Sequence, residues 1–264
     1  MMLREVMGDA ARDAPPVEIA DLAYDNRAVA REPRHAEEQR SGRDGHDYAP
    51  DAIARGAAAL VVQRPLGLGV PEVLVEDVRA VMAPAAARRF GDPTATLRAV
   101  GITGTNGKTT SAYIVRSLLE AGGIATGLLG TVAAVIGGHE RPMAHTTPEA
   151  IDLQRTFREM LDHGDEAVVM EVSSHALALH RADAIHWAVA IFTNLSQDHL
   201  DFHATMDDYL AAKRRLFEAG PHVAVINVDD PAGARLARDF GGPTTITVAI
   251  DAAVADLRAQ DVLQ

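Results

Sequence analysis

Short apolar segments alternate with amphipathic segments along most of this 264-residue chain. The apolar runs predict buried strands at residues 97–103, 124–129, 167–171, 187–193, 222–227 and 245–248. Between them, apolar residues recur at helical spacing and predict helices at about residues 107–122, 148–163, 206–218 and 231–240. Strands that alternate with helices are typical of a parallel sheet with crossover helices, so we predict the α/β fold class.

The residues before this alternation predict a second, smaller α/β unit. Its expected strands lie at residues 17–24, 58–62 and 72–75, and its expected helices at residues 50–56 and 78–90. The turn-forming cluster Gly91-Asp92-Pro93 comes shortly before the strand at 97–103. We therefore place a domain boundary there, which gives a first domain of residues 1–92 and a second domain of residues 93–264.

Composition narrows the range of functions. Of the residues, 47% are hydrophobic and 23% are charged, which is an ordinary composition for a globular protein. The formal net charge of −12 argues against a general nucleic-acid or membrane-surface binder. It contains no cysteine, which excludes disulfides, thiolate metal sites and a cysteine nucleophile. The N-terminus lacks the pattern of a signal peptide, and no apolar run has the length of a membrane span. We expect a cytoplasmic monomer with no nucleic-acid or membrane partner.

One stretch combines the features of a phosphate-binding loop. Gly104-Thr105-Asn106-Gly107-Lys108-Thr109-Thr110 lies between a predicted strand and a predicted helix. In such a loop the glycines let a phosphate approach the backbone, and the amides of the turn and of the first helical turn point at the anion. The lysine would reach the β- and γ-phosphates, and a threonine hydroxyl would hold Mg²⁺.

The match to the usual pattern Gly-x-x-x-x-Gly-Lys-Ser/Thr is incomplete, because Ile102 occupies the first glycine position. A tight turn between strand and helix, with an exposed lysine, is the simpler alternative. The surrounding strand and helix favour nucleotide binding.

Two further polar clusters follow predicted strands, at the edge of the sheet where such folds place their ligands. The carboxylate of Glu171 could hold Mg²⁺, and the alternative is a strand end at which Ser173 or Ser174 caps the next helix. In the second cluster, His199 and His203 lie near two aspartates, so we weigh zinc binding against a role at the phosphates and Mg²⁺ of the nucleotide. We expect this segment to be a loop, and a loop does not guarantee the spacing that His199 and His203 would have as zinc ligands on a helix. A role at the phosphates and Mg²⁺ of the nucleotide is therefore favoured.

For two other segments, the residues alone do not decide between a structural and a functional role. Thr146 and Thr147 connect a strand to a helix, and they predict either a helix cap or a second anion site for a phosphorylated or carboxylated substrate. Lys213 lies in the amphipathic helix at 206–218, where composition alone predicts a solvated cation on the polar face.

Together these motifs resemble the Mur ligases of peptidoglycan synthesis. The resemblance rests on segments in the same order along the chain, at residues 103–110, 129–131, 145–149, 170–177, 194–203 and 209–213. More narrowly, the chain resembles the MurE branch, which adds meso-diaminopimelate or L-lysine to UDP-N-acetylmuramoyl-L-Ala-D-Glu. The resemblance implies an ATP-dependent amide ligase in which a peptide carboxylate becomes an acyl-phosphate that the incoming amine attacks. It also implies a small N-terminal UDP-binding domain followed by a P-loop central domain.

The resemblance further implies roles for individual residues. Lys108 and Thr109 match phosphate-loop positions, and Glu171 and His199 match positions at Mg²⁺ and the ATP phosphates. Lys213 matches a lysine that is carbamylated in this family, where the carbamate can hold a second Mg²⁺. The positions that hold the UDP-substrate correspond to Thr146, Thr147, Ser173 and Arg181.

The chain departs from the family pattern in three places. Asn26 lies in the uridine-side motif, where the family usually has serine. The charged segment 31–43, which composition alone predicts to be a solvated loop, replaces an apolar strand, and we interpret it as a local frameshift or sequence error. Family members continue into a third domain that binds the amino acid, whereas we expect this chain to end within the central domain. A fragment that binds nucleotide without ligase activity, and another P-loop ligase similar to folylpolyglutamate synthetase, are the alternatives.

Overall fold

The computed structural model describes residues 1–25, 44–143, 145–242, 244–252 and 254–259. They form two compact units, Met1–Asp92 and Pro93–Gln264, each with a hydrophobic core of its own. Asn26 and the segment 31–43 lie outside the described residues. Within the described ranges, no helix has both the length and the apolar character needed to cross a membrane.

The first unit packs short helices against a small sheet. Its elements are α1 (Leu3–Met7), η1 (Gly8–Ala11), η3 (Gly45–Tyr48), α2 (Ala49–Ala54), β1 (Leu60–Val62), β2 (Glu72–Leu74) and α3 (Val78–Arg89). The two strands pair in parallel, and buried residues of α1, β2 and α3, among them Val6, Val73 and Ala85, form the core. The predicted strand at 17–24 is wrong. Among the described residues, 17–24 pair only through an isolated bridge from Glu18 to Met2, because the chain turns into α1 at Leu3 directly after Met2.

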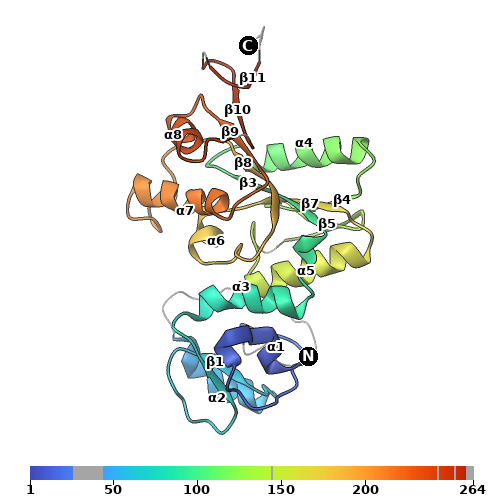
Figure 1. Ribbon diagram of the computed structural model, residues 1–264, viewed down its shortest axis with the longest axis vertical. Helices are drawn as coiled ribbons and strands as arrows, with labels where there is room; N and C mark the ends of the chain where they lie inside the picture. Colours follow the sequence, from blue (N-terminus) through green and yellow to red (C-terminus); the bar gives the residue numbers. More distant parts are fainter. Residues whose placement is uncertain (26–43, 144, 243, 253, 260–264) are drawn as a thin grey trace. The chain divides into compact units, whose positions relative to one another are not determined.

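In the part of the chain that the structure describes, the second unit is built around a nine-stranded, mostly parallel sheet (Figure 1). Its strands are β3 (Arg98–Thr103), β4 (Thr126–Leu129), β5 (Ala134–Ile136), β6 (His139–Arg141), β7 (Ala167–Glu171), β8 (Trp187–Phe192), β9 (Val223–Asn227), β10 (Thr245–Ala249) and β11 (Leu257–Arg258). Its helices are η4 (Pro93–Ala95), α4 (Lys108–Ala121), α5 (Ala150–Asp162), α6 (Ser174–Ala178), α7 (Met206–Glu218) and α8 (Pro231–Asp239). The strand order is β11-β10-β9-β8-β3-β7-β4-β5-β6, which confirms the predicted α/β class and each predicted strand of this unit to within a few residues.

The side chains of the central strands alternate between two apolar layers. In β7, Val168 and Met170 contribute to the larger layer, which α5, α7 and α8 cover, whereas Val169 contributes to the smaller layer beneath α4. Both faces of β3 and β7 are therefore buried. This burial holds the ends of these strands, and the loops that follow them, in fixed positions.

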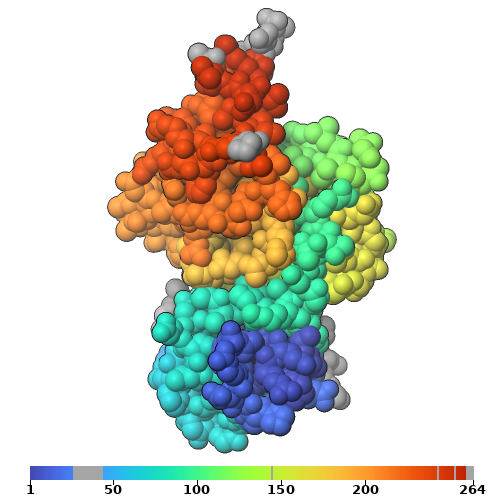
Figure 2. Space-filling model, in the orientation of Figure 1, coloured from blue at the N-terminus to red at the C-terminus, as the bar shows by residue number. Residues whose placement is uncertain are grey.

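A hairpin of β5 and β6 adds an antiparallel edge next to β4, which the sequence analysis did not predict. Gly137 and Gly138 form its turn with φ of +54° and +79°. A two-residue hairpin turn of type I′ needs positive φ at both positions, and paired glycines supply it. The opposite edge is formed by β10 and β11, which are coloured red in the space-filling view (Figure 2). Ile250, directly after β10, and Leu257 of β11 are exposed by 52% and 61%.

Candidate functional site

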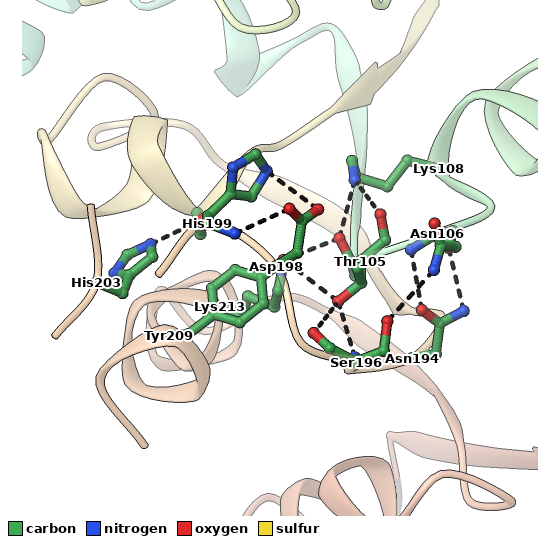
Figure 3. Close-up of polar contacts among 12 residues, drawn as sticks. Thr105, Asn106, Lys108, Asn194, Ser196, Asp198, His199, His203, Tyr209 and Lys213 are labelled. Atoms are coloured by element: carbon green, nitrogen blue, oxygen red, sulfur yellow. Dashed lines mark hydrogen bonds and ion pairs between the residues drawn. The ribbon is translucent and has the colours of Figure 1, made fainter. Parts of the chain in front are cut away.

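The turn between β3 and α4 has the backbone of a phosphate-binding loop (Figure 3). Gly104 has φ of +150°, and a Cβ atom there would lie 1.9 Å from the hydroxyl oxygen of Thr193, so only glycine fits. Gly107 has φ of +83° in open space and directly precedes α4. Backbone amides that begin a helix have no intrahelical acceptor, so the amides of Lys108 and its successors are available to an anion.

The middle of this loop is tied to the chain that follows β8 (Figure 3). The amide of Thr105 donates to the carbonyl oxygen of Asn194 at 2.9 Å, and the amide of Asn106 donates to the side-chain Oδ1 of Asn194 at 2.9 Å. Asn194 Nδ2 and the hydroxyl of Thr193 donate in turn to the carbonyl oxygen of Asn106, at 3.1 Å and 2.7 Å. These two loop amides are therefore engaged within the protein, and the amides that remain available to an anion are those at the start of α4.

Lys108 folds back over the loop that precedes it. Its Nζ donates to the carbonyl oxygens of Gly104 and Thr105, both at 2.9 Å. Burial lowers its pKa, and the negative charges of Glu171 and Asp198 raise it again in part. The ammonium group has three donors and uses two, so one remains for a ligand oxygen.

Glu171 ends β7 and lies beside the start of α4. Its carboxylate accepts a hydrogen bond from the hydroxyl of Thr109 at 2.9–3.0 Å, and Glu171 is only 1% exposed. The amide and hydroxyl of Thr131, after β4, donate to the same carboxylate at 2.8 Å and 3.2 Å. A carboxylate next to a hydroxyl oxygen is the donor set that Mg²⁺ prefers, so these side chains fit that ion.

Lys213 is buried, with 1% of its surface exposed, although composition alone predicts a solvated cation. The prediction of an exposed Lys213 is wrong because Tyr209, Leu216 and Phe217 lie at helical spacing from this residue. Lys213 therefore lies within the apolar stripe of α7. Its Nζ donates to the carbonyl oxygen of Gly104 at 2.8 Å and lies 4.3 Å from the centroid of the Tyr209 ring.

The environment of Lys213 makes its amine easy to deprotonate. Burial and then the positive charge of Lys108 lower its pKa to about 7, although the carboxylate of Asp198 opposes the change. Near neutral pH a large part of these amines is therefore uncharged, which is the form that can act as a nucleophile.

His199 belongs to an aromatic group beside α7. Its ring lies edge-on to His175 at 4.8 Å between centroids and 6.0 Å from Tyr209, and its backbone has φ of +52°. His203 is 5% exposed, and its Nε2 lies 2.9 Å from the hydroxyl oxygen of Ser174. Burial lowers the pKa of His175 and of His203. Among the described residues, no group of three or more histidine, aspartate or glutamate side chains is arranged to hold a metal ion, so the zinc alternative has no ligand set there.

The loop before α5 is fastened to the end of β7. The hydroxyl of Thr147 donates to the carbonyl oxygen of Glu171 at 3.0 Å and accepts the amide of Ser173 at 3.2 Å. Arg181 donates to the carbonyl oxygen of Thr147 at 3.3 Å and forms an ion pair with Glu149 at 2.7 Å. Arg181 Nε is buried without a hydrogen-bond partner among the described residues, which leaves one donor of this guanidinium unused.

The structure therefore brings most of the predicted residues to one edge of the sheet. That edge is formed by the carboxyl ends of β8, β3, β7 and β4, which are neighbours in the strand order. Ser173 caps α6 by accepting the amide of Ala176, as the simpler alternative predicts. Asn26 lies outside the described residues. Thr131, Asn194 and Tyr209 have no predicted role from sequence, although each lies in a segment that carries the family resemblance.

Comparison with known proteins identifies a family. Residues 102–264 match the model of the Mur ligase middle domain. The chain is 51% identical over 196 residues to a UDP-N-acetylmuramoyl-L-alanyl-D-glutamate--2,6-diaminopimelate ligase of Geobacillus kaustophilus, a match that covers 71% of this chain and 40% of the relative. A ligase of the same name from Alkaliphilus metalliredigens is 41% identical over 253 residues, which cover 94% of this chain and 51% of the relative.

A solved structure of a ligase with this name is similar as well. It has a TM-score of 0.71 and 29% identity to this chain, and the match covers 81% of this chain and 45% of the solved one. The chain spans about half the length of the relatives it matches, or somewhat less.

Proposed function

The chain belongs to the Mur ligase family, and from this premise we propose that it forms the nucleotide- and substrate-binding part of an ATP-dependent amide ligase. Its relatives are named as ligases of UDP-N-acetylmuramoyl-L-alanyl-D-glutamate and 2,6-diaminopimelate, and we propose the same substrates for this chain. In this reaction ATP transfers its γ-phosphoryl group to a carboxylate of the D-glutamyl residue, which gives an acyl-phosphate and ADP. The amine of the incoming amino acid then attacks the acyl carbon, forms the amide and releases phosphate.

The observation that carries the proposal is the meeting of Lys108, Thr109, Glu171 and Lys213 around one phosphate-binding turn. The ammonium group of Lys108 at this turn would stabilise the charge of the transferred phosphoryl group. Bound Mg²⁺ would supply further positive charge at the phosphate oxygens, and the oxygens of Thr109 and Glu171 would hold it, with His199 as a further proposed ligand. Thr146, Thr147, Ser173 and Arg181 would hold the UDP-substrate opposite the nucleotide.

Lys213 would act as an anion rather than as a cation. Because its pKa is about 7, its neutral amine can add to carbon dioxide, which gives a carbamate and releases one proton. The carbamate replaces a buried positive charge with a negative one, and its oxygens would hold a second Mg²⁺. This reading of Lys213 follows from the family, and its burial beside Gly104 supports it.

The test is ADP formation from ATP by this chain, with Mg²⁺, UDP-N-acetylmuramoyl-L-Ala-D-Glu and either meso-diaminopimelate or L-lysine. We expect ADP formation to depend on the UDP-substrate and to be lost in Lys108→Met. Retained nucleotide binding without turnover would identify the chain as a binding unit that needs further residues for catalysis. Absence of both nucleotide binding and turnover would overturn the proposal.

A further inference from the structure

The motif Leu129-Gly130-Thr131 has no part in the function proposed above, yet its last residue contacts the central carboxylate of the site. Leu129 ends β4 and lies opposite Met170 of the neighbouring strand β7. The next residues along the two strands, Gly130 and Glu171, are therefore brought side by side. A Cβ atom on Gly130 would lie 2.6 Å from Glu171 Oε1, so a glycine lets the chain pass the carboxylate this closely.

Thr131 donates two hydrogen bonds to this carboxylate. Its amide donates to Glu171 Oε1 at 2.8 Å, and its hydroxyl donates to Glu171 Oε2 at 3.2 Å. The same hydroxyl oxygen lies 3.0 Å from the hydroxyl oxygen of Thr146, in the loop before α5. Thr131 thus connects the carboxylate at the nucleotide with a loop that we assign to the UDP-substrate.

The protons of these hydroxyl groups decide how the connection works. A hydroxyl has one proton to donate, so Thr131 cannot donate to Glu171 and to Thr146 at once. Hydrogen bonds to a charged acceptor are the stronger ones, so Thr131 donates to the carboxylate and accepts the proton of Thr146. A substrate oxygen that takes the proton of Thr146 withdraws this donor and changes the hydrogen bonding of Thr131, and with it that of Glu171.

We propose that Thr131 is a positioning residue that couples the two ligand sites, so that binding of the UDP-substrate changes the affinity for Mg²⁺-nucleotide. The proposal rests on the function proposed above, because it needs both ligands to bind. Thr131 is exposed, whereas Glu171 is buried, so loss of the Thr131 hydroxyl removes the connection without opening a cavity in the core.

The test is calorimetric and does not depend on turnover. The dissociation constant of Mg²⁺-ADP is measured on this chain without and with saturating UDP-N-acetylmuramoyl-L-Ala-D-Glu, and the ratio of the two constants gives the coupling. The variants are Thr131→Val, which keeps the amide and the side-chain shape, and Thr131→Ser, which keeps the hydroxyl. Thr96→Val, at another exposed threonine of the same unit, is the matched control.

We expect a coupling ratio of about three- to tenfold in the parent chain, the range of one hydrogen bond to a charged group that is partly open to water. The ratio should fall to about one in Thr131→Val and return in Thr131→Ser, and Thr96→Val should keep the parent value. A ratio of one in the parent, or an unchanged ratio in Thr131→Val, would overturn the coupling while the proposed function stands. A parent chain that binds neither ligand would overturn the proposed function, and the coupling with it.

Discussion

Lys108 and Lys213 donate to the same acceptor, the carbonyl oxygen of Gly104, at 2.9 Å and 2.8 Å. One lysine comes from the first turn of α4 and the other from the buried face of α7. Two ammonium groups on one carbonyl oxygen repel each other, and this repulsion adds to burial in lowering the pKa of Lys213. The phosphate-binding turn therefore carries a concentrated positive charge that either an anion or the loss of one proton relieves.

The first prediction concerns the pH dependence of stability. The unfolded chain holds the Lys213 proton up to the ordinary pKa of 10.5, whereas the folded chain holds it only up to about 7. Between these values the unfolded state binds more protons, so the free energy of unfolding rises with pH over this window. Below about pH 7 the full penalty of the buried cation is present, on the order of 3–5 kcal/mol.

Urea unfolding at several pH values, in buffer free of carbon dioxide, measures this contribution of Lys213 to the free energy of unfolding. Lys213→Met should be more stable than the parent near pH 6, and the difference should shrink as the pH approaches 10. Lys108→Met keeps Lys213 but removes the neighbouring charge that helps to lower its pKa, so its stability should still rise with pH, by less than in the parent. Equal pH dependence in the parent and in Lys213→Met would contradict the prediction.

The second prediction compares the two glycines of the turn. Gly104→Ala places a Cβ atom 1.9 Å from Thr193 Oγ1, so the end of β8 must move and nucleotide binding should be lost. Gly107→Ala meets no atom within 4 Å, and only its φ of +83° is unfavourable, which costs about 1–2 kcal/mol. Urea unfolding and calorimetry with Mg²⁺-ADP should show the larger loss for Gly104→Ala. Equal losses for the two variants would show that crowding by Thr193 is not what requires glycine.

Much of the second unit could be predicted from sequence because its strands are buried on both faces and its helices are amphipathic. The local sequence pattern predicts such segments, as it does for β7 and α7, and the predicted bounds of these two elements agree with the structure. The hairpin of β5 and β6 was missed because its strands are short and follow a glycine-rich segment, although Gly137-Gly138 is a recognised hairpin turn.

The site was harder to predict, because its contacts join residues that lie far apart in sequence. Composition alone placed Lys213 on a polar face, and the spacing of Tyr209 and Leu216 on either side of it was the local signal for burial. The sequence around Thr131 and Asn194 does not indicate what these residues contact. Thr131 contacts Glu171, which lies 40 residues later, and Asn194 contacts Asn106, which lies 88 residues earlier. Their part in the site depends on the strand order, which brings these loops together.

The third prediction concerns the carboxylate of Glu171. Glu171→Gln removes its charge and turns one acceptor into a donor, which would face the donors of Thr109 and Thr131. We expect the gain in nucleotide affinity that Mg²⁺ provides to fall by about tenfold or more. Calorimetry with ADP, in the presence and absence of Mg²⁺, measures this gain. Glu166→Gln, at a side chain that is 57% exposed, should keep the parent response, and a full Mg²⁺ response in Glu171→Gln would exclude Glu171 as a ligand.

The last prediction concerns the contact between Asn194 and the phosphate-binding turn. Asn194→Ala removes Oδ1, the acceptor of the Asn106 amide, and Nδ2, one of two donors to the Asn106 carbonyl oxygen. Thr193→Val removes the other donor to that oxygen, together with a longer contact to the carbonyl oxygen of Thr103 at 3.4 Å, so the Asn106 carbonyl keeps a partner and the amide is unaffected. The two substitutions therefore separate loss of an acceptor from loss of a redundant donor.

Because this contact is exposed, water can hydrate the freed amide of Asn106, and the cost to global stability should stay below about 1 kcal/mol in either variant. The turn in Asn194→Ala should nevertheless lose its fixed conformation, so that nucleotide binding must order it again. We expect the affinity for Mg²⁺-ADP to fall by about three- to tenfold in Asn194→Ala and by less than about threefold in Thr193→Val. Parent-like affinity in Asn194→Ala would show that the turn holds its conformation without this side chain, through the backbone bond from Thr105 to residue 194.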